Sequence, residues 1–324
     1  MEKPPPRSDT LFTRSRANPL LNADRWPYPV NAVMNAGATM VGDTTVLVSR
    51  VEDRRGISHL AVARSRDGVF NWVVDERPFM CPSPDRPEEE WGLEDPRVTY
   101  VEELDAWIIA YTAFGAGGPC VSLAQTRDFV EVERLGMVMS PEDKNAALLP
   151  RRVKGDWILF HRPVATIGRR GDIWLSRSSD LRSWTAPEPV MAARVGSWWD
   201  SARIGMGPPP LETEEGWLVI YHGVRVTVAG ALYRAGLALL DLDQPSRVLH
   251  RAEDWVLSPR TTYEQVGDVP GVVFPCGMLY DEPTDQLRVY YGAADSQVAL
   301  ATANLSDVIA FLRASPEGTA DGSN

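Results

Sequence analysis

The sequence has few of the features that mark disulfide-rich, membrane or secreted proteins. Its 324 residues include only three cysteines, Cys81, Cys120 and Cys276, and no C-x-x-C pair. Neither a disulfide framework nor a zinc knuckle is therefore expected. No apolar run reaches about 18 residues, and the N-terminal segment contains no apolar signal core. We expect a cytoplasmic protein with free thiols and no spanning helix.

A net positive charge is also lacking, since 44 Asp and Glu residues outnumber 33 Lys and Arg residues and the formal net charge is −11. Nucleic acids and anionic membranes are bound by basic surfaces, so we expect neither as a partner. Three histidines at the spacing of zinc ligands are missing, and we expect no metal site. Net charge does not fix the field within one cleft, so a local basic pocket is compatible with this acidic chain.

Helical periodicity is rare, and short runs rich in Val, Ile, Tyr and Trp recur between Gly, Asp and Pro turns, as in all-β proteins. Five strong strands start 61, 50, 60 and 70 residues apart, at 46–50, 107–112, 157–163, 217–223 and 287–295. Each is followed by a small-residue strand, within 59–72, 119–129, 172–184, 233–243 and 297–307. A fivefold repeat of this kind favours a five-bladed β-propeller over a β-sandwich.

The ends of the chain differ from the repeats. Residues 1–30 contain three consecutive prolines and read as an N-terminal arm, and residues 31–314 make up the predicted propeller. The segment 306–314 predicts a short C-terminal helix with Ser306 as its N-cap. Residues 315–324 read as a mobile tail.

The strong strands carry polar residues at their C-terminal ends. These residues are Arg50, His161 with Arg162, His222 and Asp295. A charged group at the end of an apolar strand is costly unless it is paired or solvated. Breaks at equivalent positions of four repeats predict a shared polar pocket.

The most specific local motif is GLEDPRVTY at 92–100. Neighbouring residues of a strand point to opposite faces, so only one of Glu94 and Asp95 is expected to face the pocket. Arg97 would lie on the same side as Asp95 and hold or tune it.

Further polar residues cluster near the starts of other inner strands. Lys144 and Asn145 stand in DKNAALLP, Arg203 in the segment before the fourth repeat, and Asn35 and Arg55 in the first repeat. A pocket rich in basic groups within an acidic protein suits a small anion.

Seven motifs occur in register along the chain: GLEDPR, DKNAALLP, FHRP, RIGMGPPP with GWLVIYHGV, YRAG, VVFPCG and YYGAAD. Together, from about Asn18 to Asp307, they resemble glycoside hydrolase family 130, the β-mannoside phosphorylases and related mannosidases. The resemblance implies a five-bladed propeller with Asp95 as proton donor. It implies phosphate binding by Lys144, Arg162 and Arg203, with His222 nearby. Sugar contacts are expected from Asn35, Arg50, Arg55, Tyr233 and Asp295, with Glu94 and Asn145 beside them.

The predicted activity is inverting phosphorolysis of a β-mannoside, such as mannosyl-glucose or a β-manno-oligosaccharide, to α-mannose 1-phosphate. Phosphate is itself an anionic nucleophile, so one carboxylic acid suffices, and no cofactor is expected beyond phosphate as co-substrate. An inverting β-mannosidase would need a second carboxylate, for which Glu264 or Asp268 are candidates. A non-catalytic sugar-binding propeller is the third alternative, and a homo-oligomer is possible.

Overall fold

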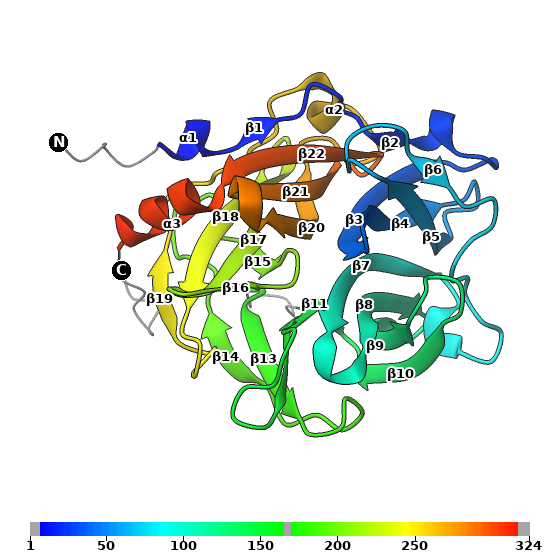
Figure 1. Ribbon diagram of the computed structural model, residues 1–324, viewed down its shortest axis with the longest axis horizontal. Coiled ribbons are helices and arrows are strands. Elements are labelled where there is room, and N and C mark those ends of the chain that lie inside the picture. Colours follow the sequence, from blue (N-terminus) through cyan, green and yellow to red (C-terminus); the bar gives the residue numbers. More distant parts are fainter. Residues whose placement is uncertain (1–6, 165–169, 317–324) are drawn as a thin grey trace.

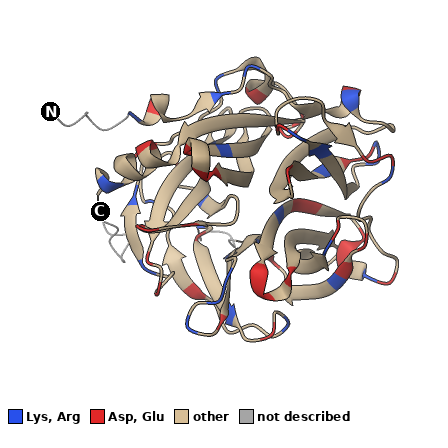
Figure 2. Cartoon of the chain, viewed as in Figure 1, with Lys and Arg blue, Asp and Glu red and all other residues tan. Residues whose placement is uncertain are grey.

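The computed structural model describes residues 7–164 and 170–316. The three consecutive prolines at 4–6 and most of the predicted tail, 317–324, lie outside the described residues. Strands dominate the chain and are largely uncharged, whereas Lys, Arg, Asp and Glu gather in the loops and turns between them (Figure 2).

The strands form five consecutive antiparallel meanders (Figure 1). The first and second share an eight-stranded sheet, joined by one parallel pairing of Ser58 with Gly92, and no strand path closes on itself in the described residues. The first meander comprises β3 (Ala32–Val41), β4 (Thr44–Glu52), β5 (Ser58–Ser65) and β6 (Val73–Val74). The second comprises β7 (Gly92–Val101), β8 (Ala106–Gly115), β9 (Gly118–Thr126) and β10 (Glu133–Met139).

The remaining three meanders are separate sheets. The third comprises β11 (Asp143–Leu148), β12 (Trp157–Pro163), β13 (Ile173–Ser178) and β14 (Glu188–Met191). The fourth comprises β15 (Arg203–Met206), β16 (Leu211–Thr213), β17 (Gly216–Thr227), β18 (Gly230–Leu240) and β19 (Val248–Arg251). The fifth comprises β20 (Val273–Asp281), β21 (Gln286–Ala293) and β22 (Gln297–Asn304). The predicted strong strands are β4, β8, β12, β17 and β21, and the small-residue strands are β5, β9, β13, β18 and β22, so the fivefold repeat of all-β units is confirmed.

The hydrophobic core is divided into clusters that lie between consecutive meanders. Leu47 of the first meander packs with Tyr290 of the fifth, and Val62 of the first packs with Ile109 of the second. The same holds for the second with the third, the third with the fourth, and the fourth with the fifth. Burial of apolar area between neighbours is therefore what holds the five units together.

The N-terminal arm is built into the fifth meander. Its strands β1 (Thr13–Arg14) and β2 (Leu21–Asn22) both pair with β22, so from residue 7 onward the arm packs on its own chain. The short helices are α1 (Ser8–Leu11), η1 (Ala23–Arg25), η2 (Pro87–Glu89), η3 (Glu102–Leu104), α2 (Thr262–Gln265) and η4 (Glu282–Thr284).

The C-terminal helix is present as α3 (Leu305–Arg313), but its predicted N-cap is wrong. Asn304 occupies the N-cap position, and the Ser306 hydroxyl donates to Asp285 Oδ2 at 2.6 Å instead of capping the helix. Within the described part of the chain, no helix is long and apolar enough to cross a membrane.

Candidate active site

All five meanders contribute side chains to one cavity of about 140 Å³. The strands β3, β7, β11 and β20 supply residues near their starts, β4 and β12 supply residues near their ends, and the fourth meander supplies His222 from β17 and Tyr233 from β18. The lining residues are Asn35, Arg50, Glu94, Asp95, Lys144, Asn145, Arg162, His222, Tyr233, Val272, Phe274 and Asp295.

Every predicted site residue except Arg203 and Arg55 is in this lining. Arg203 is not in the lining itself, but its Nη2 donates to Oη of the lining residue Tyr233 at 2.6 Å. Arg55 is not part of the lining, because Asp53 holds its guanidinium at an exposed turn with an Nη2–Oδ2 distance of 2.7 Å.

A β-bulge recurs where the first strands reach the pocket. The register shifts by one residue after Met34, after Glu94 and after Lys144. The bulged residues Asn35, Asp95 and Asn145 have φ values of 49°, 49° and 57°. This left-handed backbone conformation is uncommon for residues other than glycine. A bulge bends the strand and re-aims its side chains, and here it turns the side chain at each of these positions into the cavity.

The bulge overturns the expectation that Glu94 and Asp95 point to opposite faces. Both line the cavity, because strict alternation holds only in regular pleated strand. Arg97 binds the main chain of Asp95, donating from Nη1 to the carbonyl oxygen at 2.6 Å. Its other nitrogens donate to the carbonyls of Met206 and Gly207, so this buried guanidinium ties the second meander to the fourth.

The carboxylates of the pocket gather around Arg50. Its Nη2 lies 3.0 Å from Glu94 Oε1, and its Nη1 lies 3.4 Å from Asp95 Oδ1. Asp95 Oδ1 also accepts a hydrogen bond of 2.8 Å from Asn35 Nδ2. Asp95 thus has two donors on one oxygen within a buried site.

These surroundings separate the pKa values of the three carboxyls. Burial alone would raise the pKa of Asp95, but Arg50, Arg97 and the Asn35 hydrogen bond outweigh it and hold that pKa below its ordinary value. Burial raises the pKa of Glu94, although Arg50 opposes it. Burial and the neighbouring Asp95 raise the pKa of Asp295 to about 6.

A second group of charges, in and beside the cavity, is cationic. Lys144, Arg162 and Arg203 form no salt bridge with any other residue that the structure describes. Burial and the like charge of Arg203 lower the pKa of Arg162 to about 10. Burial and Arg162 likewise lower the pKa of Lys144. An anion bound among these groups would relieve both penalties.

His222 stands beside these cations as a neutral base. Burial and the four nearby cations hold its pKa well below the ordinary value. Its Nε2 lies 3.4 Å from Asn145 Nδ2, and no hydrogen-bond partner for its Nδ1 exists among the described residues. Asn145 Oδ1 and Arg162 Nε are similarly buried and unpaired in that part of the chain. Buried polar atoms are normally satisfied, so these three point to a polar ligand.

The sequence reading missed the apolar wall formed by Val272 and Phe274. The centroid of the Phe274 ring lies 4.4 Å from that of the His222 ring, and Phe274 and Tyr233 pack edge to face. The VVFPCG motif was the only sequence signal for this wall. A phenylalanine within an apolar strand does not indicate whether its side chain faces the core or the cavity.

The two candidate bases for hydrolysis lie elsewhere. Glu264 is fully buried outside the cavity, where it accepts hydrogen bonds from Arg14, Tyr291 and two backbone amides. Asp268 accepts a 2.8 Å hydrogen bond from Asn31 and does not line the cavity. The described residues contain no group of three or more His, Cys, Asp or Glu side chains placed to hold a metal ion.

Comparisons with known proteins identify the family. A profile of glycoside hydrolase family 130, described as β-1,4-mannooligosaccharide phosphorylase, matches residues 21–314. The chain is 33% identical over 321 residues to a β-1,4-mannooligosaccharide phosphorylase of Ruminococcus albus, covering 96% of this chain and 93% of that one. It is 36% identical over 254 residues to a β-1,2-mannobiose phosphorylase of Listeria innocua, covering 78% of this chain and 68% of the relative.

The structural comparison agrees. The solved structure of β-1,2-mannobiose phosphorylase from Listeria innocua, in complex with β-1,2-mannobiose, superposes with a TM-score of 0.84 at 28% identity. The match covers 93% of this chain and 99% of that one. A family profile that spans most of the sequence, together with these relatives and this fold, shows that the chain belongs to glycoside hydrolase family 130.

Proposed function

We propose that the protein is an inverting β-mannoside phosphorylase that uses inorganic phosphate to release α-mannose 1-phosphate. The observation that carries the proposal is the presence, near the buried carboxyl of Asp95, of three cations that form no salt bridge with a described residue: Lys144, Arg162 and Arg203. The curated relatives act as phosphorylases on β-1,4- or β-1,2-linked mannosides, which supports the same substrate class.

The proposed architecture is a five-bladed propeller spanning residues 31–314, acting in the cytoplasm, with the N-terminal arm completing the last blade. Contacts between the first strands support it, because β3 touches β20 and β7, and β11 touches β7 and β15. The core clusters support it too, since one lies between every pair of neighbours, the fifth and the first included.

In the proposed reaction, Asp95 gives a proton to the glycosidic oxygen, directly or through a sugar hydroxyl. The low pKa of Asp95 in the ligand-free site means that this proton must be acquired when substrates bind. Phosphate beside Lys144 and Arg162 offsets positive charge that now favours the carboxylate, and the sugar excludes water from it. Both effects raise the Asp95 pKa towards that of a working acid.

Phosphate is the nucleophile in this scheme. Lys144, Arg162 and Arg203 hold its oxygens, with Asn145 as a neutral donor and His222 beside them. A phosphate oxygen bonds to C1 of the mannosyl group as the bond from C1 to the leaving oxygen breaks, which inverts the anomeric centre. Fixed positive charges lower the barrier by positioning the dianion. Asn35, Arg50, Glu94, Tyr233 and Asp295 are the proposed contacts to the sugar.

Hydrolysis is less well supported. An inverting mannosidase needs a carboxylate base on the face opposite the acid. Both oxygens of the Glu264 carboxylate accept hydrogen bonds outside the cavity. The carboxylates inside the cavity, Glu94 and Asp295, lie with Asp95 around Arg50.

The test is product analysis with β-1,4-mannobiose, β-1,2-mannobiose and mannosyl-glucose, each with and without inorganic phosphate. We expect mannose 1-phosphate from at least one substrate, and only when phosphate is present. Free mannose released at the same rate without phosphate would contradict the proposal.

A further inference from the structure

A second repeated feature lies behind the pocket, on the side of each second strand that faces away from it. In four meanders an aromatic or imidazole side chain there hydrogen-bonds a buried carboxylate. The pairs are Tyr111 Oη with Glu89 at 2.8 Å, His161 Nδ1 with Asp143 at 2.6 Å, Tyr221 Oη with Asp200 at 3.0 Å and Tyr291 Oη with Glu264 at 2.8 Å. Tyr221 and His161 directly precede the pocket residues His222 and Arg162.

In each case the carboxylate belongs to the segment that enters the first strand. Glu89 precedes β7, Asp143 begins β11, Asp200 precedes β15 and Glu264 precedes β20. Three of these carboxylates also bind arginine, since Glu89 pairs with Arg134, Asp200 with Arg194 and Arg251, and Glu264 with Arg14. A buried charge persists only when it is paired and hydrogen-bonded, so these groups hold their segments in one place.

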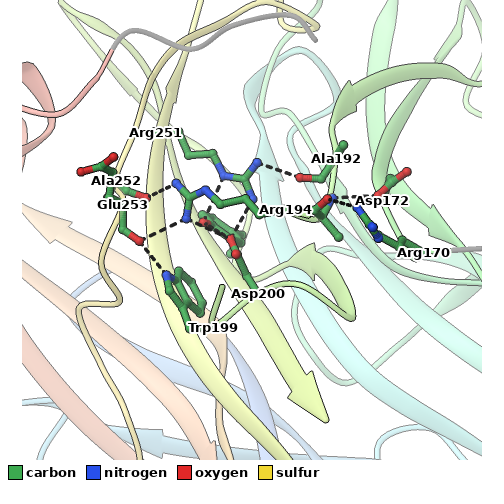
Figure 3. A network of polar contacts seen from close by, with 11 residues as sticks. Arg170, Asp172, Ala192, Arg194, Trp199, Asp200, Arg251, Ala252 and Glu253 are labelled. Carbon is green, nitrogen blue, oxygen red and sulfur yellow. Dashed lines mark hydrogen bonds and ion pairs between the residues drawn. The ribbon is translucent and has the colours of Figure 1, made fainter. Parts of the chain in front are cut away.

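We call each buried carboxylate with its hydrogen-bond donors a clamp, and Figure 3 shows the clamp of the fourth meander, around Asp200. Asp200 is fully buried, and its Oδ2 lies 2.8 Å from Arg251 Nη2 and 3.3 Å from Arg194 Nη1. Both arginines also donate hydrogen bonds to main-chain carbonyls. Arg194 donates to Ala252 and Glu253, and Arg251 donates to Ala192.

Two glycines make room for this segment on the sheet. A Cβ added at Gly223 would lie 2.4 Å from the Cβ of Asp200, and one added at Gly236 would lie 2.6 Å from the Trp199 ring. Trp199 stacks on Tyr221 with ring centroids 5.6 Å apart and donates to the Glu253 carbonyl. The segment is thus docked by packing as well as by charge.

The docked segment leads straight into Arg203, three residues after Asp200. The Ala202 amide donates to the Val224 carbonyl at 2.9 Å, and the Ile204 amide donates to the Gly171 carbonyl at 2.8 Å. Arg203 then enters the strand opposite Val224, with its guanidinium against Tyr233. The position of Asp200 on the sheet therefore sets where the Arg203 side chain begins.

We infer that Asp200 is a positioning residue for phosphate: its clamp by Arg194, Arg251 and Tyr221 fixes Arg203 at the phosphate position. The inference rests on the proposed function. The Glu89 clamp, which has the same chemistry, lies in the second meander, and its described hydrogen-bond partners are Ser83, Tyr111 and Arg134 rather than the segment that carries Arg203. The two clamps therefore differ in the ligand that each affects.

Asp200→Asn and Glu89→Gln provide a matched pair, because each keeps the shape of the side chain and removes one buried negative charge. We expect both variants to lose thermal stability. Asp200→Asn should raise the KM for phosphate about tenfold, because a displaced guanidinium binds phosphate less well. Its KM for the mannoside should change less than about twofold, and Glu89→Gln should leave the KM for phosphate within about twofold of wild type.

Tyr221→Phe and Tyr111→Phe repeat the comparison with a milder change, in case the charge variants do not fold. We expect Tyr221→Phe alone to raise the KM for phosphate, by about threefold. An unchanged KM for phosphate in the Asp200 and Tyr221 variants would overturn the inference. So would a KM for phosphate that rises as much in Glu89→Gln as in Asp200→Asn, and as much in Tyr111→Phe as in Tyr221→Phe. Wild-type protein without phosphate-dependent turnover would overturn the proposed function instead, so the two failures are distinct.

Discussion

At the scale of single residues, the pocket separates two tasks by charge. Arg50 forms salt bridges with Glu94 and Asp95, whereas Lys144 and Arg162 form none with any described residue, and burial lowers the pKa of both. The first arrangement keeps Asp95 ionised until phosphate and mannoside bind, when it accepts the proton that it later donates. The second leaves cations whose mutual repulsion favours binding of an anion.

Asp95→Asn should lower kcat for an unactivated β-mannoside by about 10³-fold, because the leaving oxygen no longer receives a proton. The loss should be much smaller with 2,4-dinitrophenyl β-mannoside, whose leaving group departs without protonation. Steady-state kinetics with the two substrates measures the difference. Equal losses on both would contradict the role of Asp95 as acid.

The raised pKa of Asp295 predicts a pH-dependent contribution to stability. Its folded-state pKa of about 6 lies above the ordinary aspartate value of 3.8, so the folded state binds this proton more tightly than the unfolded state. The contribution is complete below the lower value and is lost as pH rises through about 6. Asp295→Asn removes this dependence, and its Tm relative to wild type should be higher at pH 7.5 than at pH 4.5. A constant difference across that range would contradict the assignment.

At the scale of elements, the bulges of the first strands are what bring side chains into the pocket. Asn145 has φ 57°, which glycine adopts freely and alanine does not. Asn145→Gly should keep wild-type stability but weaken phosphate binding through loss of the amide. Asn145→Ala should weaken binding equally and also lose about 1 kcal/mol in the free energy of unfolding. Urea titration of the two variants measures that difference, and equal stabilities would argue against a strained bulge.

The same bulges mark the limit of what the sequence predicts. The second and third strands of each repeat were predictable, because β-branched and aromatic runs between turns recur five times. The pocket residues at the ends of strong strands were predictable as polar breaks in apolar runs, but whether Glu94 and Asp95 share a face depends on one extra residue in the ladder. Nothing in GLEDPR reports that insertion directly.

Long-range partners set a second limit. Glu264 looked like a free carboxylate near the last repeat, yet it is bound by Arg14, 250 residues away. Arg55 looked like a sugar contact until the turn with Asp53 placed it outside. A pairing across the whole chain leaves no local sequence pattern, so only the fold reveals it.

At the scale of the whole molecule, the N-terminal arm is joined to the last sheet. Arg14, in the N-terminal arm, binds Glu264 with Nε at 2.7 Å and Nη2 at 3.1 Å, while β1 and β2 pair with β22. Such a closure ties the first segment of the chain to the last sheet and limits opening of the core clusters.

Arg14→Met should lower the free energy of unfolding by about 3 kcal/mol, because it leaves a buried carboxylate without its cation. The double variant Arg14→Met, Glu264→Gln should lose little more than Glu264→Gln alone, since the pair acts as a unit. Chemical denaturation of the three variants measures this coupling. Fully additive losses would show that the two residues act independently.

The most direct test of the central claim is ¹H NMR of the first product formed from a β-mannobiose in phosphate buffer. The account predicts α-mannose 1-phosphate as that product, and no turnover in a buffer without phosphate. A first product of β-mannose 1-phosphate, or of free mannose formed independently of phosphate, would contradict it.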